Sequence, residues 1–177
     1  MPGNVFLEGE NVHLRTVEKD DIEFLRDGVN HPDVRVHMLN RRPQNLEDEE
    51  EFFQDVIRDE DDVHLLICRG EEPMGIISLN QHSEESKVAE IGIWLHPNYH
   101  GNGYGTEASS IMTDYGFNQL NYHKIYARAH SENEASQSIW RKLGFEQEGR
   151  LREHVYTEGE YRDAVYFGKL KGEHRDE

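Results

Sequence analysis

The sequence predicts a mixed α/β (α+β) fold. Its expected elements run in the order strand, two helices, a meander of three strands, helix, strand, helix and a closing β-hairpin, which is not the regular alternation of βαβ units. The chain has 177 residues, of which 35% are hydrophobic, so we expect one domain spanning residues 1–177. No apolar run of about eighteen residues occurs, so no membrane-spanning helix is expected.

The first half of the chain begins with an extended segment over Val5–Val17, in which apolar and polar residues alternate. Asp20 or Asp21 is expected to cap a short helix that the following His31-Pro32 pair ends. Asn45 is the expected cap of a second helix, Leu46–Arg58. Its apolar stripe predicts a core contact or the wall of a substrate cleft and consists of Phe52, Phe53, Val56 and Ile57.

The second half contains most of the expected sheet. The predicted strands are Val63–Cys68, Gly75–Leu79, Val88–Leu95, Tyr122–Ala129, Phe145–Val155 and Tyr161–Lys169. One helix should follow the glycine-rich loop after the third of these strands, with Ala108, Ile111, Met112 and Tyr115 on one face. Ser131–Glu134 matches a capping box, which predicts a helix from there to Leu143 with Gly144 as its stop.

The chain is strongly acidic. Thirty-six Asp and Glu residues against nineteen Lys and Arg give a net charge of −17, which argues against nucleic acid as a partner. Two interpretations of the acidity remain open: attraction of a polycationic substrate such as a polyamine, or adaptation to a very salty cytoplasm. The single cysteine, Cys68, excludes an internal disulfide, and no metal-binding spacing is present. The amino terminus has no signal-peptide pattern, so we expect a cytoplasmic protein.

The loop His100-Gly101-Asn102-Gly103-Tyr104-Gly105 is the most informative stretch. Alternate glycines between a strand and a helix allow successive backbone N–H groups to converge, and the helix adds its positive end. Together they predict a cradle for a pyrophosphate, although a flexible turn would share the same glycines. The loop lacks the Gly-Lys-Ser/Thr of a Walker A motif, and its G-x-G-x-G spacing is not the dinucleotide fingerprint.

Two motifs resemble those of the GNAT acetyltransferases. Residues 95–108, Leu-His-Pro-Asn-Tyr-His-Gly-Asn-Gly-Tyr-Gly-Thr-Glu-Ala, look like motif A of that superfamily, with His100 where Gln or Arg is usual. Asn133-Glu134-Ala135-Ser136, followed by Arg141-Lys142-Leu143-Gly144-Phe145, looks like motif B. The segment Glu148–Glu153 is similar to ribosomal-protein N-terminal acetyltransferases and to spermidine/diamine acetyltransferases. The resemblance is strongest between residues 88 and 169.

The resemblance implies a splayed, mixed sheet of six or seven strands flanked by about four helices, with acetyl-CoA as co-substrate. The cofactor would enter between the strands Val88–Leu95 and Tyr122–Ala129, and its pantetheine arm would pair with the backbone around Ile93, Trp94 and Leu95. Its pyrophosphate would lie on backbone N–H groups of the loop, at Gly101, Asn102, Gly103, Tyr104, Gly105 and Thr106. His100 would set the loop and could add positive charge near the phosphates. Asn133 would hydrogen-bond the pantetheine arm, and Ser136 and Trp140 complete the expected cofactor site.

Acetyl transfer to a primary amine requires a proton acceptor, an oxyanion donor and protonation of the leaving thiolate. Glu90 is the candidate base because it is the one acid in an apolar strand, where burial would raise its pKa; a Glu on the polar side of the strand is the other interpretation. The backbone N–H of Leu95 is the expected oxyanion donor. Many relatives have a Tyr where this chain has Trp140, and an indole N–H cannot give up a proton. Ser136, four residues earlier, is a second candidate acid, or an ordinary helix-surface serine.

The acceptor is less defined than the reaction. The motifs slightly favour a protein N-terminus, and a polyamine, an amino sugar or another small amine is the alternative. A GNAT-like domain that binds acyl-CoA without turnover is a third interpretation, which Trp140 keeps open. A homodimer is one assembly that we consider.

Overall fold

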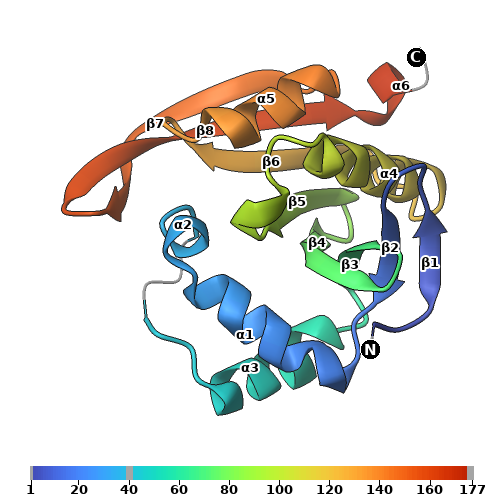
Figure 1. Ribbon diagram of the computed structural model, residues 1–177. Helices are drawn as coiled ribbons and strands as arrows, with labels where there is room; N and C mark the ends of the chain where they lie inside the picture. The colour runs from blue at the N-terminus through green and yellow to red at the C-terminus, as the bar shows by residue number, and fades with distance from the viewer. Residues whose placement is uncertain (1, 39–41, 175–177) are drawn as a thin grey trace.

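Eight strands form one sheet with the order β1-β2-β3-β4-β5-β6-β8-β7 in this computed structural model, which describes residues 2–38 and 42–174 (Figure 1). The strands are β1 Val5–Glu8, β2 His13–Thr16, β3 Val63–Arg69, β4 Glu72–Ser83, β5 Val88–Leu95, β6 Lys124–His130, β7 Glu146–Thr157 and β8 Glu160–Leu170. All neighbours in the sheet are antiparallel except β5 and β6, which run parallel.

The parallel pair is short, and this shortness opens the sheet. Its register contains Val88 with Lys124, Ala89 with Ile125 and Glu90 with Tyr126, after which the two strands separate. The remaining residues of β5, up to Leu95, therefore have a free side toward β6. We refer to this opening, between residues 91–95 and 127–130, as the splay.

Helices cover the two faces of the sheet separately. They are α1 Ile22–Asn30, α2 Pro32–Arg35, α3 Leu46–Phe52, α4 Tyr104–Asn118, α5 Glu134–Lys142 and α6 Lys171–His174. The larger hydrophobic core packs α4 and α5 against one face, with Met112, Phe117 and Trp140 among its buried side chains. A second core packs α1 and the end of the α3 segment against the other face through Leu25, Phe53 and their neighbours.

Several sequence expectations needed correction. The expected single strand over Val5–Val17 is a hairpin of two strands, because the chain turns at residues 9–12, so the sheet has eight strands rather than six or seven. The described residues form six α-helices rather than about four, since α2 and α6 are single turns too short to leave a sequence period. The expected helix Leu46–Arg58 is α-helical only to Phe52 and changes to π-helical geometry at Phe53–Ile57. Phe52 of the predicted stripe is 37% exposed, whereas Phe53 is buried.

The start of α5 was also predicted wrongly. Asn133 caps this helix by accepting a hydrogen bond from the Ser136 N–H at 3.1 Å, so Ser131–Glu134 is not its capping box. Its end was predicted correctly, since Gly144 follows the helix with a φ of 74°. No helix in the described part of the chain is long and apolar enough to cross a membrane.

Candidate functional site

The glycine-rich loop ends at the first turn of α4 and leaves that turn open. Gly103 is the N-cap residue, with φ 81° and no side-chain cap, so the N–H groups of Tyr104, Gly105 and Thr106 have no partner within the helix. Gly101 also has a positive φ, 78°. A Cβ atom added at Gly101 or Gly103 would meet nothing within 4 Å, so the space above both backbones is free for a ligand. This geometry fits the predicted pyrophosphate cradle.

The free side of β5 presents its backbone to the splay. His96 N–H donates to the Met74 carbonyl at 2.8 Å, and Gly75 lies opposite Leu95 in the register. Hydrogen-bonded pairs alternate along an antiparallel ladder, so the N–H and C=O groups of Ile93 and Leu95 point away from β4 and into the splay. An extended ligand could therefore pair with them as an added strand.

The side chains of the loop hold its shape. His100 Nε2 lies 2.9 Å from the Leu95 carbonyl, and because a carbonyl only accepts, the imidazole donates there. Asn102 Nδ2 donates to the carbonyls of Tyr99 and His100 at 3.3 Å and 3.0 Å. His100 therefore ties the end of β5 to the loop, and leaves the Leu95 N–H for another acceptor.

Trp94 is a correction to the expected cofactor site. Its backbone pairs with Ile76 of β4, and its indole packs against Phe24 and Gly28 of α1, on the opposite face from the side chains of Ile93 and Leu95. The period of two along a strand turns both its backbone and its side chain away from the splay. Trp94 thus belongs to the α1 side of the sheet.

Helix α5 lies beside the cradle. A Cβ atom at Gly105 of α4 would lie 3.1 Å from Cδ1 of Ile139 and 3.4 Å from Cδ1 of Leu95, so α4, α5 and β5 meet there. The next residue, Trp140, donates from its indole Nε1 to Ser136 Oγ, one helical turn earlier, at 3.2 Å. Trp140 is 1% exposed and packs against Phe145 with 5.4 Å between ring centroids.

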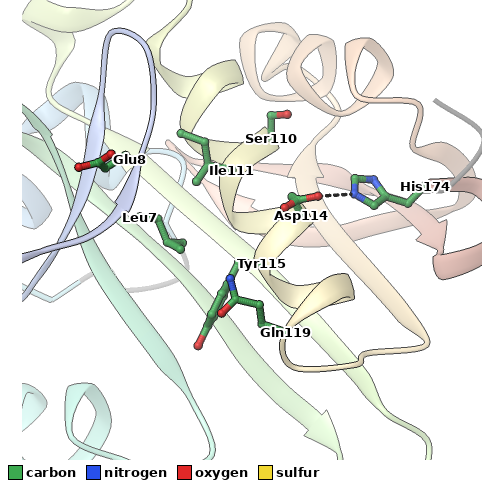
Figure 2. A pocket seen from close by; sticks show the side chains of 8 residues that line it. All are labelled: Leu7, Glu8, Ser110, Ile111, Asp114, Tyr115, Gln119 and His174. Atoms are coloured by element: carbon green, nitrogen blue, oxygen red, sulfur yellow. Dashed lines mark hydrogen bonds and ion pairs between the residues drawn. The ribbon is translucent and has the colours of Figure 1, made fainter.

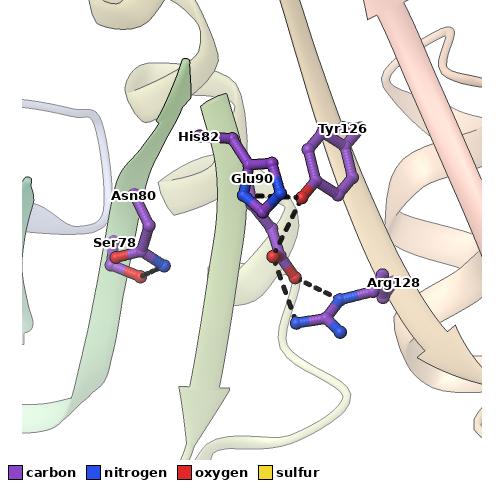
Figure 3. A network of polar contacts seen from close by, with 6 residues as sticks. All are labelled: Ser78, Asn80, His82, Glu90, Tyr126 and Arg128. Atoms are coloured by element: carbon purple, nitrogen blue, oxygen red, sulfur yellow. Dashed lines mark hydrogen bonds and ion pairs between the residues drawn. The ribbon is translucent and has the colours of Figure 1, made fainter. Parts of the chain in front are cut away.

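Glu90 stands at the last paired position before the splay and belongs to a polar network (Figure 3). Arg128 donates from Nε to Glu90 Oε1 at 2.6 Å and from Nη2 to Oε2 at 3.1 Å. Tyr126 donates its hydroxyl to Oε2 at 3.2 Å and also lies 3.3 Å from His82 Nδ1. Glu90 therefore lies within the apolar strand where the sequence placed it, but its carboxylate has hydrogen-bonding partners that the sequence did not predict.

Comparisons with known proteins decide the family. A profile described as an acetyltransferase (GNAT) domain matches residues 11–146. The chain belongs to the GNAT acetyltransferase family. It is 30% identical over 156 residues to the spermidine N(1)-acetyltransferase of Escherichia coli K12, which covers 88% of this chain and 83% of that protein. A putative ribosomal N-acetyltransferase, YdaF of Bacillus subtilis, is 33% identical over 99 residues, 56% of this chain and 54% of that protein.

The fold agrees with the family. The crystal structure of spermidine N-acetyltransferase from Vibrio cholerae in complex with CoA and spermine superimposes with a TM-score of 0.88 at 23% identity. The match covers 94% of this chain and 99% of that one. As a GNAT acetyltransferase, the protein transfers acetyl groups from acetyl-CoA to amines, and the predicted reaction class is confirmed.

Two hollows lie outside the cradle and the splay. One, of about 360 Å³, is formed by β1, the second half of α4 and His174, whose Nε2 lies 3.2 Å from Asp114 Oδ1 (Figure 2). It is at the end of α4 opposite the cradle. The other, of about 680 Å³, lies between α1 and α3. We refer to it as the acidic hollow because six carboxylates line it: Asp20, Glu23, Glu47, Glu50, Glu51 and Asp55.

Sequence reasoning missed several contacts around the predicted site residues. Tyr126 and Arg128 were not predicted, because their contacts with Glu90 depend on the parallel register of β5 and β6, which no local pattern encodes. His82 of β4 was also not predicted, and it joins the network through the Tyr126 hydroxyl. The anchor of α4 was also missed: Glu107 accepts hydrogen bonds from the backbone N–H groups of Asn11 and Val12 at 2.7 Å and 3.2 Å. No cluster of three metal-ligating side chains was found within residues 2–38 and 42–174.

Proposed function

We propose that this GNAT acetyltransferase acetylates a polyamine of the spermidine type. The observation that supports this most directly is the acidic hollow, whose lining contains six carboxylates and a single lysine, Lys19. A polyamine is a flexible chain of ammonium groups, so carboxylates spread over such a hollow match its charge. The spermidine N(1)-acetyltransferase match over 88% of the chain supports the same acceptor.

The acidic hollow and Glu90 lie on the same side of the sheet. Along β5, Ala89 and Ile91 point into the core under α4, so Glu90 and Trp94 face the α1 side. Helix α1 lines the hollow with Ile22 and Glu23 and contacts Trp94 through Phe24. An elongated cation that follows α1 would thus approach the sheet face from which Glu90 projects.

Within this proposal each predicted residue has a defined part. The cradle of residues 101–106 holds the pyrophosphate, and the backbone of Ile93 and Leu95 holds the pantetheine arm. The Leu95 N–H stabilises the developing oxyanion, and Glu90 accepts the amine proton through a water molecule. Asn133 Oδ1 is used as a helix cap, so its Nδ2 is the group left for the pantetheine arm.

A protein N-terminus is the second candidate acceptor. Asn133-Glu134-Ala135-Ser136 and the Glu148–Glu153 segment favoured it at the level of sequence, and the partial match to the putative ribosomal enzyme YdaF supports it over 56% of the chain. Turnover with spermidine, spermine and a set of N-terminal peptides, each product identified by mass spectrometry, compares the two. We expect kcat/KM for spermidine to exceed that for every peptide; the reverse order would overturn the polyamine proposal.

The acidity has a second explanation that the same enzyme preparation can test. Adaptation to a salty cytoplasm predicts that the melting temperature rises as KCl is raised to the molar range, because screening weakens repulsion among carboxylates. Binding of the polyamine in the acidic hollow predicts instead that only carboxylates lining the hollow affect KM for spermidine. Changing Glu47 and Glu50 to Gln should raise KM for spermidine, whereas Gln at Glu84 and Glu85, in the turn after β4, should leave it unchanged. Equal effects of both pairs would support general charge alone.

A further inference from the structure

Each acetyl transfer at neutral pH releases one proton. An ammonium ion and acetyl-CoA give an amide, CoA thiol and H⁺: the C–N bond forms, the C–S bond breaks, and the thiolate sulfur takes one of the two protons that the nitrogen loses. In the proposed arrangement acetyl-CoA fills the splay and the acceptor covers the sheet face from which Glu90 projects, so the second proton needs another path to water. The proposed base, Glu90, does not by itself provide that path.

We propose that Tyr126 and His82 relay this proton from Glu90 to solvent on the side where β5 and β6 are still paired, away from the splay. The relay rests on the proposed role of Glu90 as the proton acceptor. Its three groups are already joined, since the Tyr126 hydroxyl lies 3.2 Å from Glu90 Oε2 and 3.3 Å from His82 Nδ1 (Figure 3). Glu90 is 16% exposed, whereas His82 lies at the surface.

The contacts from Glu90 through Tyr126 to His82 lead away from the splay and toward the surface. In the β4–β5 register, Asn80 lies opposite Glu90 and Ser83 opposite Val88, with an irregularity between Gln81 and Ser83 that contains His82. His82 therefore lies toward the start of β5, whereas the splay opens toward the end of that strand. The imidazole stays in contact with water when both substrates are bound.

Neighbouring groups hold the relay in place. Arg128 donates to both oxygens of Glu90 and so fixes the carboxylate beside Tyr126. Burial and the neighbouring Glu90 raise the pKa of Tyr126 to about 12, which keeps the phenol protonated as a bridge. Tyr166 of β8 stacks on Tyr126 with ring centroids 6.3 Å apart and fixes the ring.

The proton step balances without any co-reactant. Once Glu90 is protonated, the Tyr126 hydroxyl turns its own proton toward His82 Nδ1. Glu90 then donates its Oε2 proton to the Tyr126 hydroxyl oxygen while the original hydroxyl proton moves to His82 Nδ1. The new hydroxyl proton lies on the Glu90 side, so Tyr126 again donates to Oε2, and the imidazolium releases one proton to water and becomes neutral. Each residue thus returns to its initial state after one turnover.

Steady-state kinetics of Tyr126→Phe and His82→Gln test the relay. Phe keeps the ring stacked on Tyr166 and removes only the bridging hydroxyl, while His82 lies at the surface, where Gln leaves the packing of the sheet intact. Tyr161→Phe is the matched control, because this side chain is 65% exposed on the β7–β8 hairpin. The acceptor is whichever amine the unmodified enzyme acetylates best, so the result does not depend on that amine being a polyamine.

The relay predicts a specific pattern. In dilute, non-basic buffer, kcat of both variants should fall roughly tenfold with KM for acetyl-CoA unchanged. Added imidazole should restore kcat of His82→Gln, because a diffusible base replaces the terminal group, and should not affect Tyr161→Phe. Unchanged kcat in both variants across the pH–rate profile, or a loss of His82→Gln activity that imidazole leaves unaltered, would overturn the relay. A wild type that acetylates peptides rather than polyamines would overturn only the proposed acceptor.

Discussion

Replacing Trp140 by Phe separates the structural part of this residue from any part in catalysis. The indole N–H donates to Ser136 Oγ at 3.2 Å, so it already has an acceptor, and an indole is too weak an acid to protonate a thiolate. We therefore expect Trp140→Phe to retain most of the wild-type kcat. Its cost should appear in stability and in acetyl-CoA affinity.

The stability cost follows from the contacts of Trp140. The side chain is 1% exposed, so removing the second ring leaves a cavity beside Phe145, worth about 1–2 kcal/mol. Loss of the hydrogen bond to Ser136 adds about 1 kcal/mol. The total of about 2–3 kcal/mol corresponds to a fall of roughly 4–12 °C in melting temperature for a chain of this size.

Calorimetry and steady-state kinetics on one acceptor measure the two effects separately. Ser136→Ala is the matched control, since it breaks the same hydrogen bond without opening a large cavity. Should kcat of Trp140→Phe collapse while folding and acetyl-CoA binding remain intact, the indole N–H would have a direct part in the transition state. The reasoning that assigns Trp140 to packing would then be wrong.

Three further changes test the cradle, the α1 face and a buried acid. Gly103→Asn should lower acetyl-CoA affinity roughly tenfold, or about 1.4 kcal/mol by calorimetric titration. Asn tolerates the φ of 81°, but its side chain fills the open space above the backbone. The control Gly159→Asn, at φ 84° in the hairpin turn, should leave the affinity unchanged. Gly28→Ala should lower the free energy of unfolding by about 1–3 kcal/mol in urea titrations, since its Cβ would lie 2.1 Å from Cη2 of Trp94; an unchanged midpoint would contradict this. Burial raises the pKa of Glu49 to about 7, so the folded state loses stability as pH rises from the unfolded pKa of about 4.5 to about 7, and Glu49→Gln should flatten that slope. An identical slope in the variant would show that Glu49 does not cause it.

The sequence predicted the parts of the fold that short-range patterns determine. The strand over Val88–Leu95 was predicted with its observed bounds, and the helix after the glycine-rich loop has Ala108 and Met112 fully buried as expected. Alternation and helical period are local properties of the chain, so both are readable without a tertiary structure. The hairpin of β1 and β2 was missed because its four-residue strands leave little room for alternation.

In the candidate site too, features set by neighbouring residues were predicted and contacts between distant residues were not. The shape of the glycine-rich loop was predictable because the positive φ angles at Gly101 and Gly103 favour glycine, and glycine is visible in the sequence. The environment of Glu90 was not predictable, because Arg128 is 38 residues away and reaches it only through a parallel pairing that ends at Glu90 itself. A register of this kind depends on how α4 returns the chain to the sheet.

The end of that pairing links the two functional features of the sheet. If β5 and β6 stayed paired to the end of β5, the backbone of Ile93 and Leu95 would be used by β6, and no ligand could add itself as a strand. If they separated earlier, Tyr126 and Arg128 would lose their register with Glu90, and its carboxylate would face the opening without partners. Separation directly after Glu90 keeps the polar network intact and the cofactor-facing backbone free. The position of the splay therefore determines both where we propose that the acetyl group lies and which residue we propose takes the proton of the acceptor.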